Sequence, residues 1–380
     1  MDSYETKEVL VLAKRYNNTK RSYLLINPLQ AKHMPAIPSE ALKMMKCLGE
    51  KIAKKYPTAG LVIGFAETAT AIATVVSECI GGSCRLFYTT RESDRGLLDW
   101  IYFNEEHSHA VEQKLFTGGL ERWIRESQQI IIVDDEISTG KTLLNMVEQL
   151  RTTYPDIRSR QIIAASIINR LSPENEARFR ESGVESEYLV KLDEIDFSKD
   201  VAGYNVKNAE SIEDERTVSE DEVIHLQEPL PDPRFGVSIS DYTVFCRRNA
   251  SSLSQSFFQE MSPNSEILVL GTEECMYPAL ILAEQIEKDY MNVSVRCHAT
   301  TRSPIGICDS AFYPIQTGYK LHSFYEEERD TYIYNLNAYD IAVVFTDSTS
   351  DDRIARADLS MLLHRNGCKR VVFVEGGRRV

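Results

Sequence analysis

The sequence predicts an α/β protein made of two doubly wound domains with mainly parallel sheets. In the first half of the chain, short apolar runs alternate with segments whose apolar residues recur at helical spacing. The same alternation resumes after residue 234, and an acidic stretch that ends in prolines separates the two halves. Because strands that alternate with helices favour parallel sheets, each half is expected to form one such domain.

The expected elements of the first half follow one another closely. A hairpin is expected over 7–26, because two β-rich runs flank the turn-like "NNTK", and Ser39 is expected to cap the next helix. The later elements, in order, are the helix 39–56, the strand 61–63 and its helix to about 80, the strand in "CRLFYTTRES", the strand 130–133, the helix 142–154, and the strands 161–169 and 186–197. Residues 95–120 lack periodicity and are expected to form a long functional or mobile loop.

The second half repeats the pattern. Its expected elements, in order, are a helix near 238–260, the strand 266–271, the helix 277–290, the strands 293–302 and 340–348, the helix 356–367 and the strand 370–377. We therefore expect a first domain over 1–205, a linker or surface excursion over 206–235, and a second domain over 236–380.

Composition excludes several classes of protein. The formal charge is −14 without a long basic run, which argues against nucleic-acid binding, since that needs a clustered positive surface. No stretch approaches the ~20 apolar residues that span a bilayer, and the N-terminus lacks a signal pattern. The eight cysteines are scattered without a C-x-x-C pair and are expected to be free. We expect a cytoplasmic protein that binds neither nucleic acid nor membrane.

The stretch 130–142, "IIIVDDEISTGKT", carries the most specific chemistry. It ends like the nucleoside-triphosphate P-loop, but the first glycine of that pattern falls at Asp135, whose carboxylate would lie against the triphosphate. A different interpretation uses every residue. A buried strand brings two acids to the edge of the sheet where α/β proteins bind ligands, and a loop rich in amides and hydroxyls then opens a helix. That combination suits ribose hydroxyls beside a single phosphate.

The same stretch resembles the phosphoribosyl-pyrophosphate (PRPP) motif of type I phosphoribosyltransferases: apolar residues, two acids and a Thr/Ser-Gly loop. The resemblance implies a type I phosphoribosyltransferase fold in the first domain. It also implies that Asp134 and Asp135 bind the ribose 2- and 3-hydroxyls; we expect both to act in catalysis and to hold Mg²⁺. The residues expected to hold the 5-phosphate are Glu136, Ile137, Ser138, Thr139, Gly140, Lys141 and Thr142.

The transfer also needs groups that stabilise the leaving pyrophosphate. The family places its pyrophosphate loop after the first sheet strand, where Phe65, Ala66, Glu67 and Thr68 would present backbone amides. Glu67 could help hold a metal or be an ordinary first-turn acid. The family's mobile hood lies near the basic and histidine residues that we expect to be catalytic, with a solvated loop cluster as the alternative for the histidines: Arg91, Arg95, His107 and His109.

Two strings in the second half, "GTEECMYPA" from Gly271 and "TTRSPIG" from Thr300, resemble the TRSP domain, which follows a phosphoribosyltransferase domain in orotate phosphoribosyltransferase-like proteins of tellurium-resistance and stress gene clusters. Three strings of the first half also have counterparts in the second in the same order, so the second half could be a diverged copy of the same fold. In the second half, the loop that corresponds to "DDEISTGKT" has one acid and no phosphate cup. The residues expected to form a second-domain site are Gly271, Thr272, Glu273, Glu274, Thr301, Arg302 and Ser303.

The sequence thus predicts a Mg²⁺-dependent phosphoribosyltransferase that moves 5-phosphoribose from PRPP to a nucleobase-like acceptor and releases pyrophosphate. Its partners would be PRPP and a small-molecule acceptor. The sequence leaves the oligomeric state open, with a homodimer as one option because hood loops in this fold often complete a neighbour's site. Two alternatives remain open: a PRPP-sensing regulatory protein without turnover, and a phosphorylase or hydrolase that uses the same phosphate cup.

Overall fold

A computed structural model of the chain describes residues 4–18, 21–92, 99–103, 113–193, 195–212, 221–257, 262–350 and 352–377. Contacts divide the chain into two compact units that are each discontinuous in sequence. The first unit comprises Met1–Thr6, Lys43–Ile195 and Pro231–Val244, and the second comprises Lys7–Leu42, Asp196–Leu230 and Phe245–Val380. Residues 7–42, which were expected in the first domain, therefore pack with the second unit.

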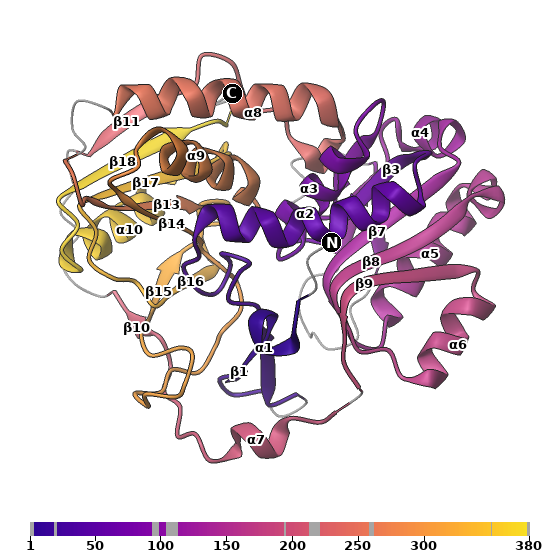
Figure 1. Cartoon of the computed structure of the whole chain (residues 1–380), viewed down its shortest axis with the longest axis horizontal. Helices are drawn as coiled ribbons and strands as arrows, with labels where there is room; N and C mark the ends of the chain where they lie inside the picture. The colour runs from indigo at the N-terminus through magenta and orange to yellow at the C-terminus, as the bar shows by residue number, and fades with distance from the viewer. Residues whose placement is uncertain are drawn as a thin grey trace. The chain divides into compact units, whose positions relative to one another are not determined.

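The first unit is built on a six-stranded sheet in the order β12-β4-β3-β7-β8-β9 (Figure 1). All neighbouring strands are parallel except β12, which runs antiparallel to β4 at one edge. The strands are β3 (Ala59–Gly64), β4 (Arg85–Tyr88), β7 (Gln129–Ile137), β8 (Gln161–Asn169), β9 (Val184–Lys191) and β12 (Val237–Ser238). The helices are α3 (Thr70–Ile80), α4 (Leu120–Glu126), α5 (Lys141–Thr153) and α6 (Pro173–Glu181), with short 3₁₀ turns η1 (Pro155–Ser159) and η2 (Pro233–Phe235).

Apolar runs explain why the central strands lie inside this sheet. Residues 130–133 of β7 and 162–168 of β8 are buried throughout, as expected of strands covered by helices on both faces. Figure 1 shows α3 on one side of the sheet and α5 on the other. The alternation of strands and helices therefore produced the expected doubly wound sheet.

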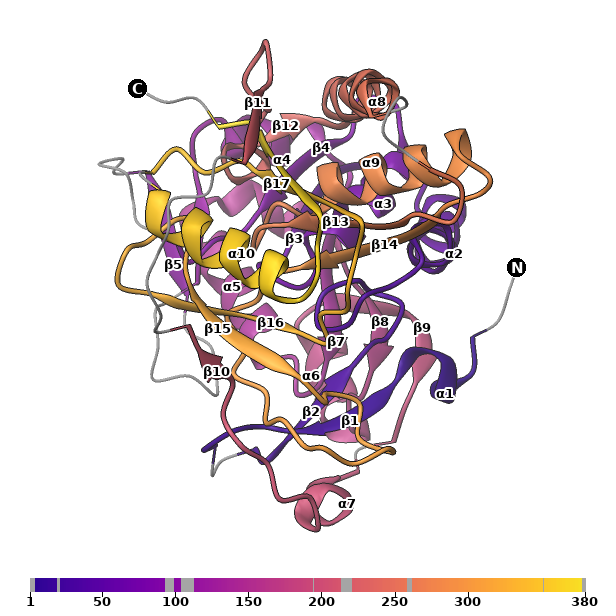
Figure 2. The same ribbon diagram turned by 90° about the vertical axis from the view of Figure 1, so that its left-hand side faces the viewer.

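The second unit contains a five-stranded, wholly parallel sheet in the order β11-β18-β17-β13-β14. Its strands are β11 (Glu222–His225), β13 (Glu266–Gly271), β14 (Ser294–Ala299), β17 (Ile341–Thr346) and β18 (Arg370–Glu375). Helices α9 (Met276–Asp289) and α10 (Arg353–Arg365) lie on opposite sides of these strands (Figure 2). The face toward α10 is an apolar core that includes Leu268, Val344, Leu359 and Phe373.

Smaller elements complete the second unit. The expected hairpin over 7–26 is present as β1 (Val11–Lys14) paired antiparallel with β2 (Tyr23–Ile26), after the short helix α1 (Thr6–Val9). A further sheet joins β10 (Glu210–Ser211), β15 (Gly318–His322) and β16 (Asp330–Tyr334). Helix α7 covers Ser198–Ala202, while α2 (Pro38–Lys55) and α8 (Ile239–Ser256) each include a boundary between the two units.

Two expectations about local structure were wrong. Residues 95–120 are not one loop, because β5 (Trp100–Phe103) and β6 (Gln113–Phe116) form an antiparallel hairpin there. Ser39 does not cap α2, since the helix begins at Pro38 and the Ser39 hydroxyl donates to Glu287 instead. The stretch 206–235, expected to be a linker or surface excursion, contains β11, which pairs with β18 at the edge of the second sheet.

The two units share one strand order. In the first unit the strand order includes β4-β3-β7-β8, and in the second it includes β14-β13-β17-β18. In both units, the strand that comes first in the chain (β3 or β13) lies between the second (β4 or β14) and the third (β7 or β17). The fourth strand (β8 or β18) lies on the far side of the third. An antiparallel hairpin separates the second strand from the third in each unit, namely β5–β6 and β15–β16. The expected correspondence of the two halves is therefore confirmed at the level of topology.

Individual hydrogen bonds at the strand ends are also shared by the two units. Thr89 donates its backbone N–H to Gly64 O at 2.9 Å, and Thr300 donates to Gly271 O at 3.0 Å. The N–H of Ala66 donates to Thr89 Oγ1 at 2.9 Å, and that of Glu273 donates to Thr300 Oγ1 at 2.9 Å. Strand ends and the turns after them thus match residue by residue.

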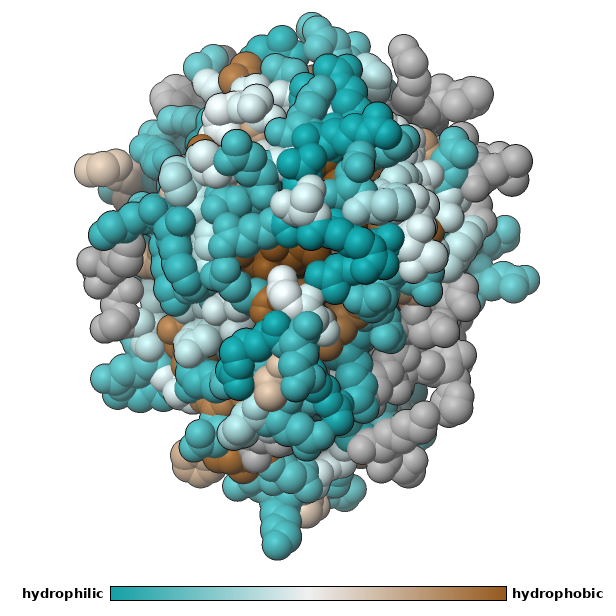
Figure 3. Space-filling model, turned by 90° about the vertical axis from the view of Figure 1, so that its right-hand side faces the viewer, coloured by the Kyte–Doolittle hydropathy of each residue, from teal (hydrophilic) through white to brown (hydrophobic). Residues whose placement is uncertain are grey.

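Among the described residues, no helix is long and apolar enough to cross a membrane. The face of the molecule in Figure 3 is mostly hydrophilic, with hydrophobic residues exposed only in small patches.

Candidate functional site

The two predicted aspartates lie near the end of β7, which lies between β3 and β8 in the sheet of the first unit. Asp134 pairs in register with Ser166 of β8, and the strand continues to Ile137, further than the sequence indicated. Asp134 Oδ1 accepts the backbone N–H of Asp135 at 2.9 Å. Both residues are half-buried, and they lie at the edge of the sheet where α/β proteins bind ligands.

Asp135 is also bonded to the neighbouring loop. The Thr68 hydroxyl donates to Asp135 Oδ1 at 2.7 Å. Burial raises the pKa of Asp135, while the hydrogen bonds from Thr68 and within the Asp134–Asp135 pair lower it and the charge of Glu136 raises it. The structure therefore brings the predicted pyrophosphate loop and the predicted ribose-binding acids together.

The predicted phosphate cup follows β7 directly. Ser138 and Thr139 connect the strand to Gly140, which precedes helix α5 with a φ of 72°. A Cβ atom on Gly140 would lie 2.2 Å from Cε2 of Phe179, so both the backbone conformation and the packing require glycine. The first N–H groups of a helix have no partner within it and carry partial positive charge, which suits a phosphate dianion. The side chain of Lys141 is exposed.

Glu136 has a structural bond that the sequence did not reveal. Its carboxylate forms an ion pair with Arg170 at 3.1 Å, and the two side chains are only 13% and 5% exposed. Arg170 directly follows β8, and its guanidinium also donates to the carbonyl of Ile195. The Glu136 side chain therefore connects the end of β7 to the residue that follows β8.

The predicted pyrophosphate loop, residues 65–68, presents fewer amides than expected. The N–H of Phe65 donates to Val133 O at 2.9 Å, and that of Ala66 donates to Thr89 Oγ1 at 2.9 Å. The expectation that these two amides face a ligand is therefore wrong, because both already bond within the sheet edge. Glu67 is 5% exposed, and the Thr68 hydroxyl donates to Asp135. The peptide bond between Ala66 and Glu67 is cis.

The predicted hood residues are only partly described. Arg91 lies half-buried shortly after β4, close to the end of the sheet. Arg95, His107 and His109 lie outside the described residues.

In the second unit, the predicted site residues meet in a network of buried ion pairs. Glu273 is 0% exposed, and its Oε2 contacts Arg302 Nε at 2.8 Å and Arg329 Nη2 at 2.7 Å. Arg302 Nη2 also contacts Glu274 Oε1 at 3.0 Å. The buried ammonium of Lys32 donates to the carbonyl oxygens of Glu273 and Thr300. These carboxylates are therefore bonded to cations of the same unit.

The remaining residues of that predicted site have structural partners too. Thr272 shares a hydrogen bond with the Tyr325 hydroxyl at 2.8 Å. The N–H of Ser303 donates to Thr301 Oγ1, and Gly271 approaches the backbone of Cys275 closely. The sequence did not indicate Arg329, which completes the network, because it lies 27 residues beyond Arg302 in the chain.

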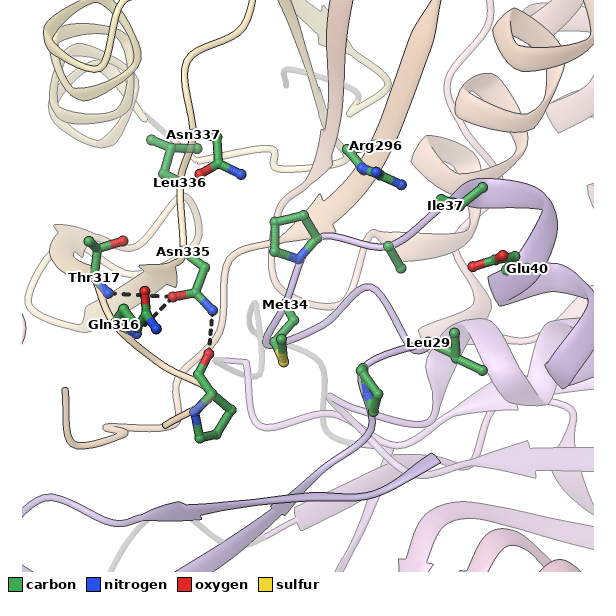
Figure 4. A pocket seen from close by; sticks show the side chains of 14 residues that line it. Leu29, Met34, Ile37, Glu40, Arg296, Gln316, Thr317, Asn335, Leu336 and Asn337 are labelled. Carbon is green, nitrogen blue, oxygen red and sulfur yellow. Dashed lines mark hydrogen bonds between the residues drawn. The ribbon is translucent and has the colours of Figure 1, made fainter. Parts of the chain in front are cut away.

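A separate pocket of about 550 Å³ lies elsewhere in the second unit (Figure 4). Apolar side chains such as Leu29, Met34 and Ile37 line one part of it, and Arg296 and Glu40 line another. Asn335 is used internally, because its amide donates to Pro314 O and accepts from Gln316 N. The pocket includes none of the residues that the sequence predicted as functional.

The comparison with protein families agrees with this geometry. Residues 9–196 match a family model described as phosphoribosyl transferase, and residues 232–363 match the TRSP domain, described as C-terminal to that transferase. The chain joins a phosphoribosyl transferase family domain to a TRSP domain. The acid pair and the glycine loop of the first unit thus lie within the transferase match.

Solved structures with similarity to the chain include several phosphoribosyltransferases. Adenine phosphoribosyltransferase from Saccharomyces cerevisiae is 11% identical, with a TM-score of 0.34 over 48% of this chain and 96% of that one. The Trypanosoma brucei enzyme is 14% identical, with a TM-score of 0.38 over 56% and 86%. Orotate phosphoribosyltransferase from Aeropyrum pernix is 18% identical, with a TM-score of 0.27 over 40% and 72%. No curated protein matches the sequence significantly.

Proposed function

We propose that the first unit transfers 5-phosphoribose from PRPP to a nucleobase-like acceptor and releases pyrophosphate. The observation that carries this proposal is the sequence of groups at the end of β7. Two carboxylates, Asp134 and Asp135, precede a Ser-Thr-Gly loop and the N-terminus of α5. Ribose hydroxyls donate well to carboxylates, and one phosphate fits the amides of a helix N-terminus.

The reaction breaks the bond between the anomeric carbon and the pyrophosphate oxygen and forms a bond from that carbon to a nitrogen of the acceptor. The sugar carbon becomes cation-like as the pyrophosphate leaves, and the acceptor nitrogen loses its proton. Carboxylates close to the ribose would stabilise the positive charge that develops there. Loop 65–68, bonded to Asp135 through Thr68, would hold the pyrophosphate on the other side of the sugar.

Mg²⁺ is part of the proposal. This ion prefers oxygen ligands and is usually held by one or two carboxylates together with substrate phosphates. Asp134 and Asp135 supply such carboxylates at a single strand end, so they fit an ion that also binds PRPP. Mg²⁺ would neutralise the leaving pyrophosphate. Among the described residues, no cluster of three or more His, Cys, Asp or Glu side chains is arranged around a metal position.

The experiment is pyrophosphate release from PRPP and Mg²⁺ across a panel of purine and pyrimidine bases. We expect release with at least one base, and a loss of release when Asp134 and Asp135 are both changed to asparagine. The matched control is Asp347→Asn, which changes the single acid at the corresponding strand end of the second unit. Release without any base would instead favour a hydrolase, and PRPP binding without release would favour a sensor.

A further inference from the structure

The backbone of Ala66 is held in a closed ring of hydrogen bonds in the first unit. Its N–H donates to Thr89 Oγ1 at 2.9 Å, and the Thr89 hydroxyl donates to Gln113 Oε1 at 2.6 Å. The ring closes because Gln113 Nε2 donates to the carbonyl of Ala66 at 2.7 Å. Thr89 is 0% exposed and Gln113 is 1% exposed, so water does not compete for these bonds.

The ring allows only one orientation of the Gln113 amide. Turning the amide over would place its oxygen against the carbonyl oxygen of Ala66 and leave two acceptors facing each other. It would also remove the acceptor of the Thr89 hydroxyl hydrogen, because an amide NH₂ group only donates. The side chain therefore recognises one conformation of loop 65–68.

Gln113 reaches this loop from a separate element. It is the first residue of β6 and lies 47 positions from Ala66 in the chain. Lys114, the next residue, exchanges backbone hydrogen bonds with Thr90 directly after β4. Side-chain hydrogen bonds thus connect loop 65–68 to β7 through Thr68 and Asp135, and to β6 through Gln113.

The second unit provides a natural comparison. Its backbone pair between Thr301 and Tyr332 corresponds to the pair between Thr90 and Lys114, so Thr331 stands where the first unit has Gln113. As in the first unit, a backbone N–H of the turn donates to the threonine, here from Glu273 to Thr300 Oγ1. The Thr331 hydroxyl, however, donates to the carbonyl of His322 and not to the turn. The side-chain amide that closes the ring, that of Gln113, is therefore present in the first unit, which carries the acid pair and the predicted phosphate cup. The second unit has Thr331 at the corresponding position.

We propose that Gln113 is a positioning residue that holds loop 65–68 in the conformation that binds pyrophosphate. This inference rests on the proposed phosphoribosyl transfer. Gln113 bonds directly to the carbonyl of Ala66 and, through the Thr89 hydroxyl, to its N–H, so it restrains the backbone that leads to Glu67 and Thr68. Gln113 itself does not touch the substrate. Its removal should affect the pyrophosphate half of the site and leave the 5-phosphate cup at Gly140 unchanged.

The test measures two ligands separately by calorimetry in the presence of Mg²⁺: pyrophosphate and ribose 5-phosphate. In Gln113→Leu the Ala66 carbonyl and the Thr89 hydroxyl lose their buried partner, and we expect pyrophosphate to bind about tenfold more weakly. Affinity for ribose 5-phosphate should stay within about twofold of the wild type, since its contacts lie on another loop. The matched control is Gln129→Leu, at the opposite end of β7, where Gln129 bonds to Thr58 and Gln161.

A second variant separates positioning from folding. Gln113→Glu keeps the size of the side chain but places a carboxylate oxygen against the Ala66 carbonyl, so it should weaken pyrophosphate binding even where Gln113→Leu folds poorly. An unchanged affinity for pyrophosphate in both variants, or an equal loss for both ligands, overturns the inference. Wild-type protein that binds neither ligand overturns the proposed function itself.

Discussion

The Thr68 hydroxyl donates a hydrogen bond of 2.7 Å to Asp135 Oδ1 and so joins the two loops that the proposed reaction requires. Thr68 lies in the turn after β3, and Asp135 lies near the end of β7, the neighbouring strand. This bond therefore connects the proposed pyrophosphate loop to the proposed ribose site.

The first prediction concerns the pH dependence of activity. The Thr68 hydroxyl lowers the pKa of Asp135, which burial raises. In Thr68→Val this pKa should rise further, so that the acidic limb of the kcat/KM profile moves to higher pH. Thr68→Ser keeps the hydroxyl and should keep the profile. An identical profile for the valine variant would show that Asp135 need not be ionised.

The second prediction concerns Gly140. In Gly140→Ala the new methyl group would overlap the Phe179 ring, and the left-handed backbone adds strain. We expect a loss of unfolding free energy of about 2–4 kcal/mol, measured by urea denaturation.

Gly82→Ala is the matched control for that experiment. Gly82 also has a positive φ, of 59°, but a Cβ atom there meets nothing within 4 Å. Gly82→Ala should lose about 1–2 kcal/mol of unfolding free energy, from backbone strain alone. Equal losses for the two variants would show that the Phe179 contact does not constrain the phosphate loop.

Sequence patterns predicted the part of the site that is local in the chain. Asp134, Asp135 and Gly140 lie within seven consecutive residues, and the apolar run before them identified the strand that positions them. The repeated strand order was predictable for a similar reason, since the glycine, arginine and acid landmarks occur in the same order in both halves.

The missed residues act over long separations in the chain. Gln113 bonds to Ala66 and Arg170 pairs with Glu136, and neither partner is visible from spacing. The hairpin β5–β6 consists of two four-residue strands, too short for a clear alternation of burial. Strand β11 lies in an acidic stretch and forms because β18 offers an edge to pair with, so tertiary contacts outweigh local preference.

The third prediction concerns the buried ion pairs of the second unit. Glu273→Ala leaves Arg302 and Arg329 without their shared carboxylate, and we expect it to cost about 3–5 kcal/mol of unfolding free energy. Asp340→Ala removes the carboxylate that accepts from the exposed Lys369 and from the N–H of Glu266, and it should cost much less. A cost for Glu273→Ala as small as that of the control would contradict a buried network.

The fourth prediction concerns stability and pH. A hydrogen bond to Asp221 is the main cause of the raised pKa of His364, on α10. A raised pKa contributes stability that is complete below the ordinary histidine pKa of about 6.5 and is lost as pH rises through the raised value. Asp221→Asn should therefore destabilise the protein more at about pH 6 than at about pH 9, by less than about 1 kcal/mol because the pair is partly exposed.

The control for this pH effect is His364→Asn, which removes the titrating group. Adding Asp221→Asn to that background should cost the same at both pH values, measured by urea denaturation. A difference that persists in the double variant would assign the pH dependence to another group.

The central claim is that Asp134 and Asp135, together with the loop that follows them, bind PRPP. Calorimetric titration of PRPP in the presence of Mg²⁺ tests it most directly, with wild-type protein, the double variant Asp134→Asn with Asp135→Asn, and the control Asp347→Asn. The account predicts binding to the wild type and the control, and a loss of affinity of at least about tenfold in the double variant. No binding to the wild type, or equal binding to all three proteins, would contradict it.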